Sequence, residues 1–112
     1  MPSIQSLSGK PSFARVHATG RRCSRDGVTA IVATRESGPA RLGLAVGKSA
    51  GKAVVRNKIR RRLREAVRAY DPGPADVVLI GRAALATEPF SRVEEYVKTC
   101  LESAGAPKRS AR

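Results

Sequence analysis

The side chains with the clearest chemical potential form a dense run of positive charge in residues 48–68, where nine basic residues stand against one acid, Glu65. A guanidinium group binds phosphate through two parallel hydrogen bonds and stacks on nucleobases, so such a run is suited to recognising a polyanion. A surface built only for solubility would mix charges of both signs, because like charges on neighbouring helical turns destabilise a helix. The run therefore predicts contact with nucleic acid.

Side-chain patterns that could catalyse a reaction are weak by comparison. Residues 43–49 read G-x-x-x-G-K-S, one residue short of a nucleotide-binding phosphate loop. The single histidine, His17, has no accompanying Ser, Cys or carboxylate constellation, and no paired carboxylates or histidines indicate metal binding or proton transfer. Cys23 and Cys100 lie in no CxxC pattern and are predicted to be free thiols. We expect no catalytic residue and no metal ligand in this chain, so any chemistry must come from a partner.

The positive charge is concentrated in one part of the chain. The 112 residues carry a net charge of +13, and residues 48–68 alone carry +8, whereas residues 69–112 hold six basic and six acidic side chains. This asymmetry favours a localised site for a polyanion. The N-terminal residues lack the apolar core of a signal peptide, and the longest aliphatic run, residues 77–80, is too short to cross a membrane. We expect a cytoplasmic protein with no membrane partner.

An amphipathic helix is predicted to carry the basic run. Its apolar stripe consists of Val55, Ile59, Leu63, Ala66, Val67 and Tyr70. This spacing matches the 3.6-residue repeat and predicts a helix from about Ala53 to the stop at Asp71 and Pro72. Such a helix can bury its stripe on a sheet and present the opposite, cationic face to a nucleic acid.

Five further elements frame this helix. A short helix is predicted from Pro11 to Gly20 and a final one from Ser91 to Gly105. Strands are predicted at residues 28–34, 41–47 and 76–81, with the first two forming a hairpin. On one face of the second strand, Gly43 and its small neighbours would leave room for a close approach.

The predicted fold is α+β: a small two-layer sandwich in the order α-β-β-α-β-α, with helices packed on a mainly antiparallel sheet. Residues 10–105 would form one RNA-binding domain, with residues 1–9 and 106–112 as disordered ends. If the strands flanking the basic helix are parallel, the general handedness rule favours a right-handed crossover.

The segments LGLAVGK (residues 42–48) and GKAVVRNKIRRRLRE (residues 51–65) resemble the signature region of the bacterial ribonuclease P protein subunit. The resemblance implies a rare left-handed crossover around the basic helix. It also implies a role beside a catalytic RNA, which uses Mg²⁺ to remove the 5′ leader from precursor tRNA while the protein assists binding. The expected partners are this RNA and the leader, without a cofactor on the protein side chains and without an obligate protein partner.

The resemblance implies two RNA-binding surfaces. One is the basic turn and helix, comprising Lys48, Lys52, Arg56, Asn57, Lys58, Arg60, Arg61, Arg62, Arg64 and Arg68. The other is a cleft between the first helix and the sheet that would take the single-stranded leader, comprising Phe13, Arg15, His17, Arg21, Arg22, Arg25 and Ile31. Phe13 suits stacking on an unpaired base, although it could equally fill the core. His17 and Ile31 stand where relatives often have aromatic residues.

Three other functions compete with this hypothesis. A ribosomal-type structural RNA-binding protein would explain the charge and the small fold equally well, but it would not depend on a leader. A DNA-binding module lacks the expected helix-turn-helix or zinc pattern. An NTPase would need the complete phosphate loop.

Overall fold

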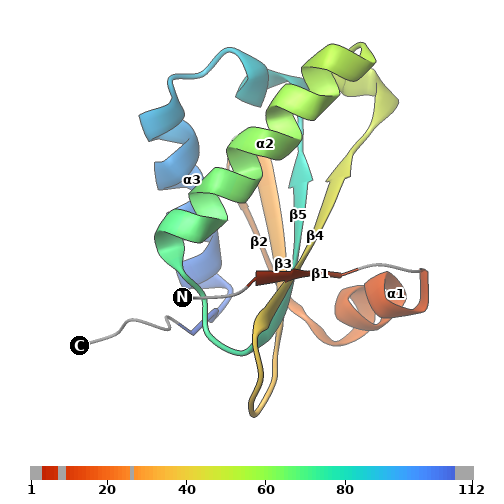
Figure 1. Cartoon of the computed structure of the whole chain (residues 1–112), viewed down its shortest axis with the longest axis vertical. Helices are drawn as coiled ribbons and strands as arrows, with labels where there is room; N and C mark the ends of the chain where they lie inside the picture. Colours follow the sequence, from red (N-terminus) through yellow and green to blue (C-terminus); the bar gives the residue numbers. More distant parts are fainter. Residues whose placement is uncertain (1–3, 8–9, 26, 108–112) are drawn as a thin grey trace.

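The computed structural model describes residues 4–7, 10–25 and 27–107 (Figure 1). Its strands are β1 (Ile4–Ser6), β2 (Arg21–Arg25), β3 (Val28–Thr34), β4 (Ala40–Val46) and β5 (Ala75–Gly81). Its α-helices are α1 (Lys10–Thr19), α2 (Ala53–Tyr70) and α3 (Phe90–Ser103), with short 3₁₀ turns η1 (Lys48–Ala50) and η2 (Ala83–Ala86). The predicted α+β class and all six predicted elements are confirmed.

The five strands form one mixed sheet in the order β1-β4-β5-β3-β2. β4 pairs in parallel with β1 and β5, and β3 pairs antiparallel with β2 and β5, so the sheet is half parallel and not mainly antiparallel. The predicted hairpin between β3 and β4 is wrong, because β5 lies between them. β5 is an almost continuous apolar run, which suits the central position where both faces of a strand are buried.

The crossover from β4 through α2 to β5 is left-handed. In Figure 1 both strands point upward, α2 lies in front of them, and β5 lies to the left of β4. The expectation drawn from the family resemblance is therefore confirmed, and the general right-handed rule does not hold here.

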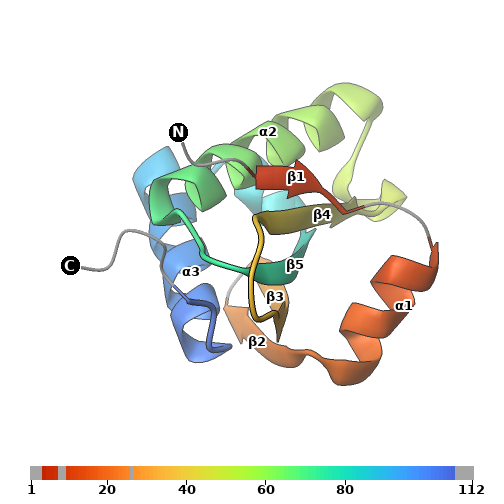
Figure 2. The same ribbon diagram turned by 60° about the horizontal axis from the view of Figure 1, so that its bottom comes forward.

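Helices cover both faces of the sheet, so the fold has a partial third layer in addition to the two predicted (Figure 2). α2 and α3 pack on one face over the main core, which includes Val77 and Leu79 of β5. α1 packs on the opposite face over a small cluster of Leu7, Val16, Ile31 and Val78. Alternation along β5 explains this split, since successive side chains of a strand point to opposite faces.

Both chain ends contain ordered residues that the sequence predicts to be disordered. Residues 4–6 form β1, and the Leu7 amide donates a hydrogen bond to the Leu42 carbonyl at 2.9 Å. Near the other end, the Tyr70 hydroxyl donates to the Ala106 carbonyl at 2.8 Å. The remaining residues of the predicted ends, 1–3, 8–9 and 108–112, lie outside the described residues.

The boundaries of α2 agree with the sequence prediction. The helix begins at Ala53 and ends at Tyr70, and Asp71 adopts a left-handed conformation (φ 58°) with its amide bonded to the Val67 carbonyl. In contrast, β2 was not predicted, because Arg21–Arg25 has no apolar alternation and forms an edge of the sheet. No helix in the described part of the chain is long and apolar enough to span a membrane.

Candidate nucleic-acid interface

The apolar stripe of α2 is buried against the sheet as predicted. Ile59, Leu63 and Val67 are completely shielded from solvent, and Val55 packs partly buried against the same core. The opposite face therefore points outward along the full length of the helix. Seven residues of the predicted RNA-binding surface are exposed, two of them in the turn before α2 and five on the helix: Lys48, Lys52, Asn57, Lys58, Arg61, Arg64 and Arg68.

Three predicted arginines of α2 are only half exposed, and one of them has a structural role. Arg62 donates hydrogen bonds from Nη1 to the carbonyl oxygens of Leu85 and Glu88, which lie in and after η2. These hydrogen bonds connect α2 to the segment that follows β5, so the Arg62 guanidinium does not face outward. Arg56 and Arg60 are also half-buried, and Arg60 donates to Asn57 Oδ1 at 3.0 Å. Asn57 thus orients a guanidinium on the basic face.

The N-terminus of α2 is open to an anion. Its N-cap is Lys52, no side chain caps the helix, and the first turn contains no acid. The exposed amides and the positive end of the helix dipole both favour negative charge. Gly51 joins η1 to the helix at φ 134°, a conformation that only glycine adopts without strain, so the basic turn is positioned by the backbone.

On the other face of the sheet, Phe13 of α1 lies directly over Gly43 of β4. A Cβ atom added at Gly43 would come within 2.5 Å of the Phe13 Cζ atom, so the ring uses the room left by the missing side chain. Phe13 is half-buried against Leu7, Val16 and their neighbours. The ring is therefore partly core filler and partly exposed, and its exposed part can stack on a base.

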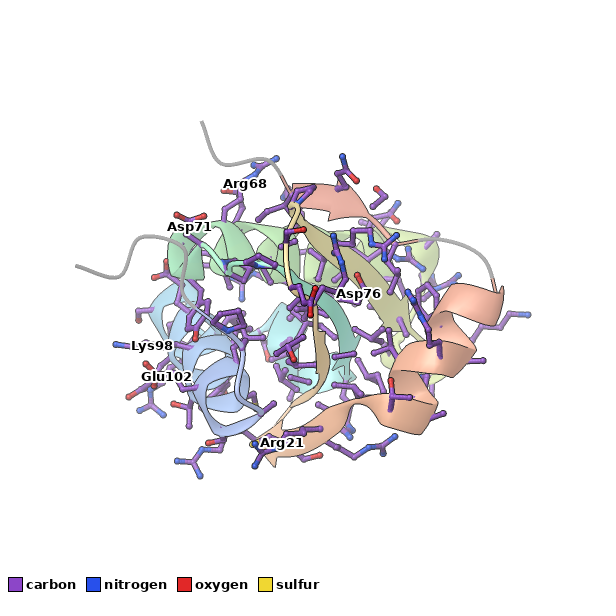
Figure 3. All side chains as sticks on the ribbon, turned by 90° about the horizontal axis from the view of Figure 1, so that it is seen from below. Arg21, Arg68, Asp71, Asp76, Lys98 and Glu102 are labelled. Carbon is purple, nitrogen blue, oxygen red and sulfur yellow. The ribbon has the colours of Figure 1, made fainter. Side chains whose placement is uncertain are left out.

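The predicted residues of the leader cleft fall into two groups because β2 alternates. Arg22 is paired with Ile31 and lies on the α1 face, with its Nη2 atom 3.5 Å from His17 Nδ1. Arg21 and Arg25 are paired with Val32 and Val28, whose side chains belong to the core under α2 and α3. Figure 3 shows Arg21 at the end of β2 beside α3. Arg21 and Arg25 therefore face away from the cleft.

Two further predicted cleft residues, Ile31 and Arg15, contribute to the folded structure through a core contact and an ion pair. Ile31 is only 1% exposed and forms part of the small core beneath α1, so its side chain cannot reach a ligand. Arg15 is bonded through Nη2 to Asp76 Oδ2 at 2.8 Å. Of the predicted cleft residues, Phe13, His17 and Arg22 remain on the α1 face, at least partly exposed and outside the ion pairs of Asp76.

Asp76 is a feature that sequence reasoning missed. Its carboxylate is 1% exposed and accepts hydrogen bonds from Arg15 of α1, from Arg35, and from both Nε and Nη2 of Arg41. A buried carboxylate is tolerated only when it is paired, and three guanidinium groups fill this requirement. In Figure 3 Asp76 lies at the centre of this end of the sheet. The signal in the sequence was a lone acid opening an apolar strand.

Sequence reasoning also missed a hydrogen-bonded group of Ser24, Thr29 and Arg82, which lies on the α1 face near the start of β3. The Thr29 hydroxyl bonds to the Ser24 hydroxyl at 2.9 Å and accepts a hydrogen bond from Arg82 Nη2 at 2.8 Å. Arg82 follows β5 and is exposed, so it adds a cation at the far end of the cleft face.

The described residues contain no cluster of three or more His, Cys, Asp or Glu side chains that could hold a metal ion. Both cysteines are free thiols as predicted: Cys23 is half-buried and Cys100 is buried. The geometry supports binding, with a cationic helical face on one side of the sheet and the half-buried Phe13 ring on the other.

Comparison with known proteins agrees with this geometry. The model of the family described as Ribonuclease P matches residues 1–105. This chain belongs to the ribonuclease P protein family. The ribonuclease P protein component of Symbiobacterium thermophilum is 36% identical to it, over 97% of this chain and 98% of that protein. The corresponding protein of Gluconacetobacter diazotrophicus is 38% identical, over 88% of this chain and 90% of that protein.

Solved structures of the family share the fold. The RNase P protein of Staphylococcus aureus superposes with a TM-score of 0.80 at 23% identity, over 92% of this chain and 97% of that one. The protein from Thermotoga maritima superposes with a TM-score of 0.74 at 25% identity, over 85% of this chain and 93% of that one. Family membership implies an RNA partner in the ribonuclease P holoenzyme.

Proposed function

We propose that this protein is the protein subunit of a ribonuclease P and assists a catalytic RNA in removing the 5′ leader from precursor tRNA. The observation that carries the proposal is the division of α2 into a buried apolar stripe and an outward cationic face. The cationic face would bind the catalytic RNA, and the cleft at Phe13 would hold the single-stranded leader.

The protein would contribute binding and not bond cleavage. The RNA and the Mg²⁺ ions that it holds would supply the chemistry. Arginine fits the binding role because its planar fork contacts phosphate bidentately. At the cleft, the partly exposed ring of Phe13 offers a stacking surface, and His17 and Arg22 add donors beside it.

The test is cleavage of precursor tRNA at low Mg²⁺ concentration by a bacterial ribonuclease P RNA, with and without this protein. We expect the protein alone to be inert and to restore cleavage by the RNA at the mature 5′ end. Tight RNA binding without an effect on cleavage would contradict the proposal and favour a ribosomal-type structural role.

The role of α2 is tested with the double variant Arg61→Glu, Arg64→Glu. Both residues are exposed on α2, so the fold should survive. Affinity for the catalytic RNA should fall, and the slope of log K against log salt should flatten by roughly 0.7–0.9 for each phosphate that the variant no longer binds. The control Arg92→Glu, Lys98→Glu makes the same charge change on the exposed surface of α3. Equal losses in the two variants would show a general charge effect and contradict a specific α2 interface.

A further inference from the structure

A groove at the free edge of β4 connects the two surfaces described above. β1 pairs with only the first half of β4, ending at Ser6 opposite Leu42. From Gly43 to Val46, β4 pairs with β5 on one side, and in the described part of the chain no strand pairs with its other side. The backbone groups of an unpaired strand edge are open to a ligand.

The register identifies the backbone groups that face this groove. The Leu42 carbonyl accepts a hydrogen bond from the Leu7 amide and therefore points toward the β1 side. Successive residues of a strand direct their amides and carbonyls to opposite sides, so the backbone groups of Leu44 point the same way as those of Leu42. A donor and an acceptor of Leu44 are thus presented just beyond the end of β1.

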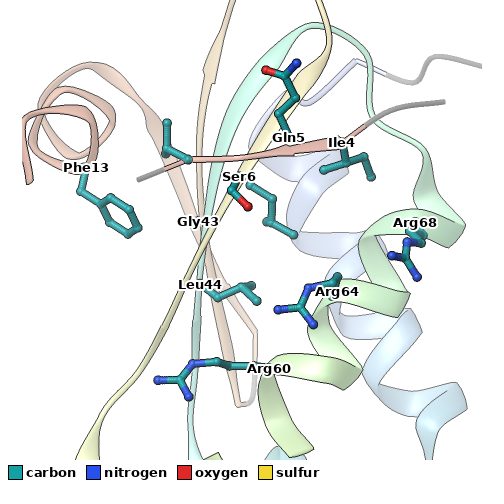
Figure 4. A pocket seen from close by; sticks show the side chains of 11 residues that line it. Ile4, Gln5, Ser6, Phe13, Gly43, Leu44, Arg60, Arg64 and Arg68 are labelled. Atoms are coloured by element: carbon teal, nitrogen blue, oxygen red, sulfur yellow. The ribbon is translucent and has the colours of Figure 1, made fainter. Parts of the chain in front are cut away.

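Different side chains form the two walls of the groove, which has a volume of about 240 Å³ (Figure 4). Arg60, Arg64 and Arg68 line one side at four-residue spacing, which spans about 12 Å along α2. Phe13 lies at the other end, and Leu44 and Ile4 supply apolar surface between them. Arg64 extends toward β4 in Figure 4, and no hydrogen bond to it is seen among the described residues.

We propose that this groove binds an unpaired RNA nucleotide together with its flanking phosphates. The arginines match phosphate groups, the apolar surface and the Phe13 ring match the face of a base, and the Leu44 amide and carbonyl match the polar edge of a base. A base inside a duplex cannot offer its face, so the site requires a single strand. The inference rests on the proposed function, and it adds that one RNA strand can run continuously from the α1 cleft to α2.

An acidic peptide is the competing occupant, since it could add a strand to the β4 edge and pair with the arginines. The observations favour RNA. The three arginines follow the helix and not the β4 edge, and an aromatic ring at one end suits a base. The net charge of +13 points to the same class of partner.

The experiment follows backbone amide signals of the full-length protein by NMR during titration with a short single-stranded oligoribonucleotide. A duplex of the same length and an acidic peptide are titrated in parallel. We expect the Leu44 and Val46 amides to shift with the single strand and not with the duplex. Equal shifts with the duplex, or shifts confined to α2, would overturn the proposal, because phosphate binding alone would explain them. A response of Leu44 to the peptide and not to RNA would overturn it in favour of a protein partner.

Ser6→Glu tests the groove directly. Ser6 lies on the α2 face of β1, so the new carboxylate would face the arginines and compete with RNA phosphates. Affinity for the single strand should fall about tenfold, near the low end of the free energy that one stacked base contributes. The control Ser91→Glu makes the same substitution at an exposed residue of α3, which lies on the other side of α2 from β4 (Figure 1), and should change affinity less than about twofold. Equal effects of the two substitutions would overturn the proposal.

A second variant keeps the proposal testable if Ser6→Glu causes local unfolding of β1. If the Leu7 amide signal shows that Ser6→Glu detaches β1, Arg64→Gln replaces it, because Arg64 is an exposed helical residue (Figure 4) and no hydrogen bond or ion pair of its side chain is seen among the described residues. Arg64→Gln should abolish the Leu44 response, and a retained response would overturn the proposal. Failure of the proposed function is distinguishable: wild-type protein would then not assist cleavage, whereas failure of the groove alone leaves Ser6→Glu fully active in cleavage.

Discussion

The two faces of the sheet differ in how many apolar residues they bury. Among the described residues, the face under α2 and α3 buries a cluster of 22 residues, and the face under α1 buries a cluster of four. The first cluster buries the apolar stripe of α2 along the helix, so many contacts set the position of the basic helix. Among the described residues, α1 is held by the smaller cluster and by the ion pair between Arg15 and Asp76, so the position of Phe13 depends on fewer interactions. The stability of the fold and the shape of the cleft should therefore respond to different mutations.

The largest expected effect is a contrast in stability between two identical substitutions. Leu63→Ala removes a side chain at the centre of the main core and should reduce the free energy of unfolding by about 3–5 kcal/mol. Leu7→Ala removes one from the small cluster at the sheet edge, where neighbours can relax, and should cost about 2 kcal/mol. Urea denaturation measures both. Equal losses would show that the two faces are equally well packed.

Gly43→Ala should damage the cleft with a smaller loss of stability. The new Cβ would meet the Phe13 ring at 2.5 Å, so the ring must move, at a cost of about 1–3 kcal/mol. Affinity for leader-bearing tRNA should fall while affinity for leaderless tRNA stays unchanged. Gly47→Ala is the control, because its Cβ would have only Ser49 Oγ nearby, at 3.8 Å. If both variants bind the leader normally, Phe13 is not part of the leader site.

Arg15→Met tests whether Asp76 positions α1. The variant breaks the bond between α1 and the sheet, while Arg35 and Arg41 still neutralise Asp76. Because the Arg15 side chain is 55% exposed, the stability loss should be at most about 1 kcal/mol. Preference for leader-bearing over leaderless tRNA should fall about threefold or more, through displacement of Phe13.

The matched control for Arg15 is Arg35→Met, which removes an Asp76 partner without touching α1. It should preserve the leader preference. The salt dependence separates positioning from direct contact: if Arg15 bound a leader phosphate itself, Arg15→Met would reduce the salt slope by about 0.7. An unchanged slope with a reduced leader preference is the expected result.

The smallest expected effect is a pH dependence of the free energy of unfolding that arises from Tyr70 in the main core. Burial, with a further contribution from the nearby Glu102 carboxylate, raises the pKa of Tyr70 above its usual value of 10.0. The folded state therefore holds this proton more tightly than the unfolded state. The resulting stability is fully present below about pH 10 and is lost as the pH rises through the folded-state pKa.

The measurement is the free energy of unfolding between pH 8 and 11 for wild-type protein and Tyr70→Phe. Wild type should lose more stability over this range than the variant, which has no proton to release and no bond to the Ala106 carbonyl. Parallel pH profiles would contradict the assigned shift. Binding of leader-bearing tRNA at neutral pH should be nearly unaffected, since Tyr70 lies on the face away from α1.

Sequence reasoning succeeded where a signal is local. The stripe from Val55 to Tyr70 predicted both the helix and its buried face, because helical periodicity depends only on spacing along the chain. It failed for β1 and β2, whose residues are mostly polar and become strands only through pairing at the sheet edges. The ordering of Ala106 likewise depends on Tyr70, 36 residues earlier in the chain.

The same distinction applies to the candidate site. The excess of positive charge, the α2 helix that carries it and the resemblance to a family follow from residue type and spacing alone. Which cations are available to RNA depends on the folded arrangement. Arg62 bonds to the segment after β5, Arg15 to Asp76, and Arg21 and Arg25 face α3, whereas Arg64 remains exposed. A guanidinium pairs with whichever acceptor the fold brings near it, and these acceptors come from segments distant in the sequence.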